Sequence, residues 1–138
     1  MKKKHKKSYS DKQAFVVALD IFDVDIGVCI NMSEKEIKQW VKKVSGKKYK
    51  HFDEEKVNDW DKDETDVGRT IYFLSGVILL FRFEKDQFRK SCGIIVHEVA
   101  HTVFHLCNTR RTPLVEDTDE IYAYMTESLM KKILYKLY

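Results

Sequence analysis

Two long helical segments, separated by the only proline of the chain, place the strongest constraint on the fold. Residues 93–106 are apolar on nearly every helical face, so we expect this helix to be buried. After residue 116, apolar side chains recur at helical spacing as far as Leu137. Pro113 cannot continue the first helix, because it has no backbone N–H and clashes with the preceding turn. The second helix can therefore return antiparallel beside the first.

The residues before these helices predict a small sheet. Residues 14–19 form an apolar run typical of a buried strand, and residues 22–30 alternate in the manner of a half-buried strand. Residues 71–74 and 77–83 flank Ser75-Gly76, which predicts a hairpin. The predicted fold class is α+β, a small antiparallel sheet packed on the two C-terminal helices.

A helix and a charged segment are expected between the strands. Ser33 and Glu36 have the spacing of a capping box, which starts an amphipathic helix with Trp40 in the core. Residues 47–67 are charged and predict a solvated loop, whose Trp60 could form a wall of a binding groove.

The first C-terminal helix carries the motif His97-Glu98-Val99-Ala100-His101. Residues four apart lie on one helix face, so His97 and His101 can direct two imidazoles at one metal ion. Glu98 lies beside them, where a carboxylate can act as general base on water. The alternative is a pair of core histidines bonded to backbone carbonyls, with Glu98 paired to a lysine. The motif predicts a zinc site, because one ion would satisfy all three groups.

A catalytic zinc ion has three protein ligands, so one more is expected. We predict Glu120, at the start of the second helix, as that ligand; the alternative is a helix-start acid like Asp117 and Asp119. His105 continues the histidine stripe, but three successive turns span about 12 Å, too far for one ion. We expect His105 to be structural or to support a ligand. Cys107 is a weaker candidate ligand, since a free cysteine is usually a small buried hydrophobe.

Two tyrosines and one glutamate follow Glu120. Tyr124 lies four residues later on the same face and is our candidate donor to the oxyanion of a hydrolytic reaction. Tyr122 is the alternative donor. Either tyrosine could instead be an aromatic residue of the core. Glu127 is a candidate for orienting a histidine.

The combination of residues 97–101 with Asp119-Glu120-Ile121-Tyr122-Ala123-Tyr124 resembles the small zinc metallopeptidases common in bacteriophage genomes. It is more distantly similar to peptidases that cleave immunity repressors, and to the gluzincin plan generally. The hairpin at residues 68–81 resembles the one before the metal helix in that group. The resemblance implies His97, His101 and Glu120 as zinc ligands and Glu98 as catalytic base.

Length and charge bound the remaining expectations. With 138 residues we predict one zincin-like domain at residues 13–138, preceded by a disordered basic arm at residues 1–12 with five lysines in its first seven positions. This arm is either a solvated segment or a binder of acidic partners. No apolar run is long enough to span a bilayer and no leader peptide is visible, so the expected location is the host-cell cytoplasm or the virion.

The predicted function is a zinc-dependent metallohydrolase, a peptidase of phage origin acting on a protein or peptide substrate. The alternative from another class is an inactive structural or interaction protein of the same fold, which binds a phage or host protein. A nucleic-acid-binding module that uses the lysines is the third possibility.

Overall fold

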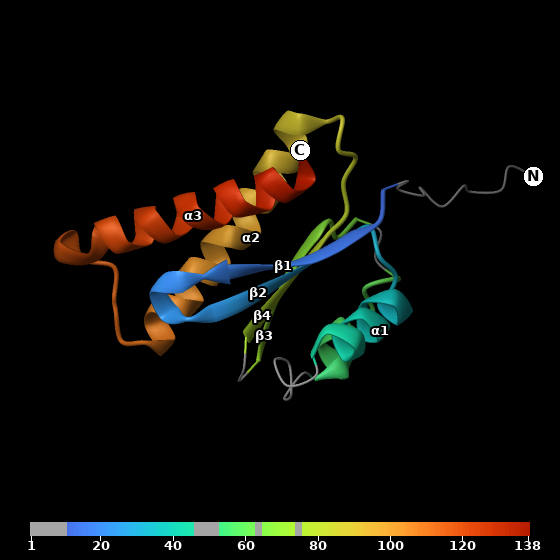
Figure 1. Cartoon of the computed structure of the whole chain (residues 1–138), viewed down its shortest axis with the longest axis horizontal. Coiled ribbons are helices and arrows are strands. Elements are labelled where there is room, and N and C mark those ends of the chain that lie inside the picture. The colour runs from blue at the N-terminus through green and yellow to red at the C-terminus, as the bar shows by residue number, and fades with distance from the viewer. Residues whose placement is uncertain (1–10, 46–52, 63–64, 74–75) are drawn as a thin grey trace, which may run out of the picture.

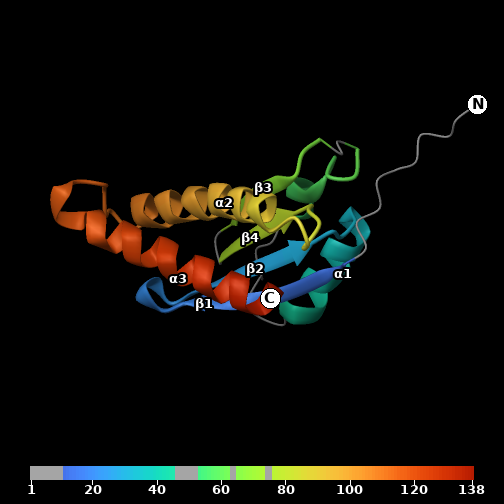
Figure 2. The same cartoon turned by 90° about the horizontal axis from the view of Figure 1, so that it is seen from above.

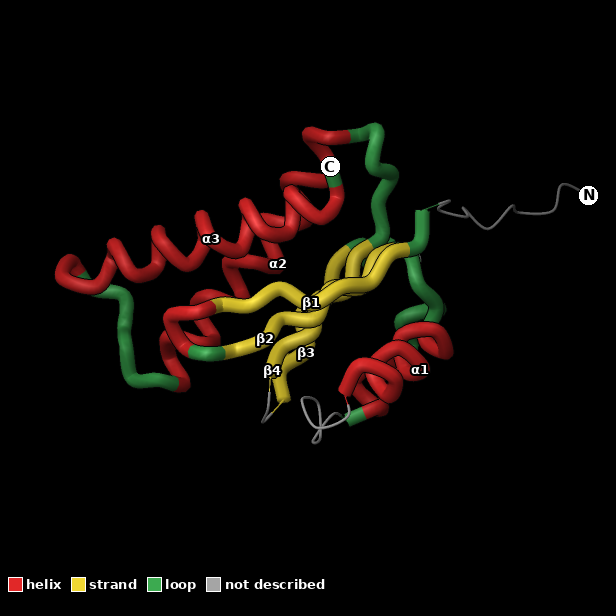
Figure 3. Tube along the Cα trace, in the orientation of Figure 1, coloured by secondary structure: helices red, strands yellow, loops and turns green. Residues whose placement is uncertain are grey.

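A four-stranded sheet with helices on both faces forms the protein (Figure 1), as seen in a computed structural model that describes residues 11–45, 53–62, 65–73 and 76–138. The predicted N-terminal arm therefore lies almost wholly outside the described residues. The strands are β1 (Gln13–Leu19), β2 (Val24–Ile30), β3 (Gly68–Phe73) and β4 (Gly76–Phe81), and the helices are α1 (Glu34–Ser45), α2 (Phe88–Thr109) and α3 (Asp119–Leu137). Figure 3 shows the strands between the α2–α3 pair and α1.

The sheet has the order β1-β2-β4-β3. β1 pairs antiparallel with β2, and β3 with β4, which confirms the predicted hairpin. β2 and β4 pair in parallel, so the α+β class is confirmed but the sheet is mixed rather than antiparallel. The parallel pairing arises because the chain between these strands, including α1 and β3, crosses from one end of the sheet to the other.

Position in the sheet decides how far each strand is buried. β1 lies at an edge and is mostly half-buried, whereas β2 lies in the middle and is almost wholly buried. The sequence predicted the opposite, because the local pattern of a strand does not show which neighbours cover it. A 3₁₀ turn at Asp20–Phe22 joins the two, and Asp23 follows it with a φ of 50°.

Each face of the sheet has its own hydrophobic core. Val77, Leu79 and Phe81 of β4 point into the core under α2 and α3. Ile78 and Leu80 point into the core on the α1 side. β4 is therefore buried on both faces. The strand order makes β1 and β3 the edges of the sheet.

The α1 side confirms one prediction and corrects another. The amide of Glu36 donates to Ser33 Oγ (3.2 Å) and the amide of Ser33 donates to Glu36 Oε1 (3.1 Å), so the capping box is present. Trp40 packs on this core while staying half-buried. Trp60 is only 1% exposed, with the guanidinium of Arg82 3.7 Å from its ring centroid. Trp60 belongs to this core and is not a groove wall beside α2.

α2 and α3 run in opposite directions side by side on the other face (Figure 2), as the position of Pro113 predicted. α2 contacts β3 and β4, and α3 contacts β1. The expectation that α2 is buried on nearly every face is wrong, because only the sheet and α3 cover it. His97 and His101 lie on its uncovered side. Among the described residues, no helix is both long enough and apolar enough to cross a membrane.

Candidate metal centre

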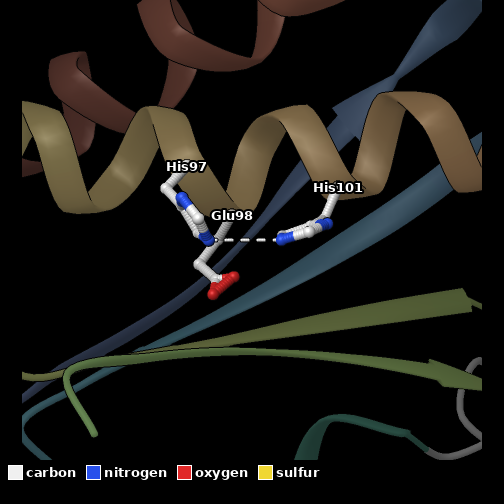
Figure 4. A group of neighbouring side chains, drawn as sticks. All are labelled: His97, Glu98 and His101. Carbon is white, nitrogen blue, oxygen red and sulfur yellow. Dashed lines mark hydrogen bonds between the residues drawn. The ribbon is translucent and has the colours of Figure 1, made fainter.

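His97 and His101 direct their imidazoles at each other from adjacent turns of α2 (Figure 4). Their Nε2 atoms are 3.2 Å apart, and both side chains are exposed. Two nitrogens bound to one tetrahedral zinc at about 2.0–2.1 Å would be about 3.3 Å apart. The observed spacing therefore fits shared coordination of one ion, and it also fits a hydrogen bond between two neutral imidazoles.

Glu98 completes the cluster from the buried side of the helix. Its side chain is 6% exposed, and Oε2 accepts a hydrogen bond from Thr70 Oγ1 at 3.0 Å. One carboxylate oxygen and one nitrogen of each imidazole all lie within 4.8 Å of one another. In the described part of the chain, this is the only cluster of three or more such groups with metal-binding spacing.

Strand β3 forms the wall opposite the motif. Thr70 and Tyr72 face α2, and Gly68 lies so close that an added Cβ would be 3.0 Å from Glu98 Cγ and 3.2 Å from Oε1. A side chain at this position would press on the carboxylate. These three residues were not predicted as site residues from the sequence, although their alternation along one strand face was a usable signal.

Tyr72 and His105 extend this wall by one helical turn. Their rings stack with centroids 3.7 Å apart and an interplanar angle of 21°. Burial raises the pKa of Tyr72, and the negative charge of Glu98 raises it further. His105 thus packs against Tyr72 of β3. It does not belong to the cluster of His97, Glu98 and His101.

The structure does not bring Glu120 or Tyr124 to the histidines. Both are exposed, whereas Tyr122 is 7% exposed and donates from its hydroxyl to the carbonyl of Thr112 at 2.7 Å. Two residues correspond to about 200° of helix rotation, so Glu120 and Tyr124 lie on the side of α3 away from its buried face. Within the described ranges, neither side chain makes a hydrogen bond, ion pair or ring contact. Their predicted roles gain no support from the geometry.

Two further candidates have other partners. Glu127 is exposed and forms an ion pair of 2.6 Å with Lys131, so it does not orient a histidine. Cys107 is buried, and its Sγ lies 3.6 Å from Met125 Sδ on α3. Cys107 therefore plays the packing role and not the ligand role.

A hollow of about 490 Å³ opens between α2 and the start of β3. His97 and Glu98 lie in its wall with Gly68, and the cations Arg89 and Lys90 lie at the end nearest the start of α2. The cluster is therefore reachable from solvent by a molecule larger than water.

Comparison of this chain with protein-family models, with curated proteins and with solved structures gave no match. The family resemblance accordingly remains a prediction that rests on the motif residues.

Proposed function

We propose that this protein is a zinc-dependent hydrolase of peptide bonds, with the ion held by His97 and His101. The observation that carries the proposal is the 3.2 Å separation of the two Nε2 atoms next to the nearly buried Glu98. Two imidazoles are ligands suited to zinc, and an adjacent carboxylate can serve as the base of a hydrolytic zinc site. The assignment to the bacteriophage type of metallopeptidase draws only on the resemblance of the motif.

The ion, Glu98 and Thr70 have separate roles in this proposal. The zinc ion, when bound, acts as a Lewis acid that polarises the carbonyl of the scissile bond. Glu98 takes a proton from the attacking water and passes it to the leaving amine. Thr70 donates to Glu98 Oε2 and so holds the carboxylate in one orientation, which leaves Oε1 for the proton.

The substrate is expected to bind as an extended peptide along β3. β3 is an edge strand, whereas β4 is covered on both sides and has no free edge. Peptides add to such an edge through backbone hydrogen bonds. Residues of β3 also face Glu98.

Glu98→Gln tests the proposed chemistry, because glutamine keeps the size and the hydrogen bond from Thr70 but cannot accept the proton. With the zinc-loaded full chain and a library of internally quenched peptides, we expect hydrolysis to fall about 10²–10⁴-fold. Zinc content should stay unchanged. Hydrolysis that survives in Glu98→Gln, or a wild-type protein that holds zinc and cleaves no peptide, would contradict the proposal.

A second candidate function, binding of a phage or host protein without hydrolysis, is favoured by one observation. The cluster holds two imidazoles and one carboxylate, so with Glu98 as base it is one protein ligand short of an ordinary catalytic zinc site. Partner binding that is unchanged in Glu98→Gln would favour this candidate.

A further inference from the structure

A second hollow, of about 530 Å³, lies further along α2 and β3 than the metal centre. His105 and Tyr72 lie in its wall. His105 is about 6 Å further along α2 than His101, and Tyr72 is two residues after Thr70 on β3. Both walls of the metal centre therefore extend into this hollow, and a ligand could span the two.

The lining of this hollow is net positive. Lys56 and Arg110 contribute two permanent positive charges, Asp23 contributes one negative charge, and Thr109 adds a hydroxyl. The lining thus has an excess positive charge even when His105 is neutral.

The two cations keep donors available. Lys56 Nζ donates to the carbonyl of Tyr72. Arg110 lies 4.9 Å from the ring centroid of Phe22 and donates from one nitrogen to Thr109 Oγ1 at 3.2 Å. In the residues that the structure describes, neither cation forms an ion pair with a carboxylate.

The charge of these cations acts on His105. Burial lowers the pKa of His105, and the positive charges of Arg110 and then Lys56 lower it further. The other titratable or charged groups of the lining are Asp23 and Tyr72. A bound anion would have the opposite effect, because it favours the protonated imidazole.

We propose that this hollow binds a carboxylate of the substrate, so that the enzyme prefers peptides with an acidic group close to the scissile bond. The inference rests on the proposed function for the identity of the substrate. A carboxylate group brings one negative charge, which balances the net charge of Lys56, Arg110 and Asp23, whereas a phosphate dianion would leave an excess negative charge in the hollow.

Glutarate provides a direct test of binding that needs no metal. It is titrated into the full chain without added zinc while the imidazole signals of His105 are followed by NMR. We expect saturable binding that raises the pKa of His105, and no such effect with the neutral analogue glutaramide. Absence of a saturable shift, an equal shift with glutaramide, or tighter binding of inorganic phosphate would overturn the proposal.

Arg110→Gln supplies the matched variant, with its neighbour Arg111→Gln as control, since Arg111 is exposed and does not line the hollow. We expect Arg110→Gln to weaken glutarate binding about tenfold, through loss of a charge-assisted hydrogen bond. Arg111→Gln should bind as the wild type does. Equal losses in both variants would indicate general attraction by surface charge and overturn the site.

Peptide cleavage identifies the source of the carboxylate. Amidated peptides with Glu near the scissile bond are compared with the same peptides carrying Gln. Peptides without acidic side chains are compared with a free and with an amidated C-terminus. Preference for Glu assigns an acidic side chain, and preference for the free end assigns the chain terminus; either should be lost in Arg110→Gln. Cleavage without any preference would overturn this inference alone. Glutarate binding without cleavage of any peptide would overturn the proposed function and leave the anion site intact.

Discussion

The two flanks of helix α2 differ in chemistry. Toward β3, Glu98 meets Thr70 through a hydrogen bond and His105 stacks on Tyr72. Toward α3, the contacts are apolar. The rings of Phe104 and Tyr122 lie with their centroids 5.3 Å apart, and the sulfur atoms of Cys107 and Met125 are 3.6 Å apart. The β3 flank therefore has the groups that the proposed hydrolysis would use, and the α3 flank has apolar contacts that stabilise the fold.

The polar contacts of the motif at residues 97–101 lie on β3 and not on α3. The sequence pointed to α3, the helix after the motif, as the source of a third ligand. The structure places the polar partners on the strand before the motif, because α2 rests on the hairpin it follows and exposes its histidines on that side. Variants on the two flanks can break or sharpen this contrast.

Gly68→Ala should have the largest effect of the flank variants. Its Cβ would lie 3.0 Å from Glu98 Cγ, so the carboxylate must move. The neighbouring carboxylate must give way by a few tenths of an ångström. Because a displacement of about 1 Å can cost about 10²-fold, we expect this smaller shift to lower peptide hydrolysis roughly 30-fold while zinc stays bound.

Gly93→Ala is the matched control, since apart from its chain neighbours and the backbone of its own helix no atom lies within 4 Å of an added Cβ there. It should keep full hydrolysis and raise the free energy of unfolding by about 0.5–1 kcal/mol, as alanine replaces glycine inside a helix. Equal activities of the two alanine variants would refute the close fit of β3 against Glu98.

Thr70→Val should have a smaller effect. It keeps the shape of the side chain but removes the hydrogen bond to Glu98 Oε2, and we expect hydrolysis to fall about tenfold. Thr126→Val on α3 is the comparison, because its hydroxyl donates only to the carbonyl of Tyr122 in its own helix (2.8 Å). A loss as large in Thr126→Val as in Thr70→Val would remove the distinction between the flanks.

Glu120→Gln and Tyr124→Phe should have the smallest effects. Both side chains are exposed on α3, so zinc affinity and hydrolysis are expected to stay within about twofold of the wild type. A tenfold loss of zinc affinity in Glu120→Gln, measured by calorimetric titration, would restore Glu120 as third ligand.

Much of the fold could be predicted from local signals. The capping box at Ser33, the hairpin and the two helices around Pro113 each depend on a few neighbouring residues, and all are present. The parallel pairing of β2 with β4 and the burial of Trp60 could not be predicted, because they depend on contacts between segments far apart in the chain.

The candidate site divides in the same way. His97 and His101 were predictable, because a helix fixes the spacing of residues four apart. The partner of Glu98 was not, since Thr70 is 28 residues away and its contact depends on which edge of the sheet α2 covers. The exposure of Glu120 could not be predicted, because it depends on which face of α3 packs inward. The buried Tyr122 shows which face that is.

Zinc titration of the full chain, followed by calorimetry, tests the central claim most directly. We predict one zinc ion per chain, loss of this binding in His97→Gln and in His101→Gln, and retention in His105→Gln, a histidine of the same helix that stacks on Tyr72. Absence of saturable zinc binding in the wild type, or binding that persists in His101→Gln, would contradict the account.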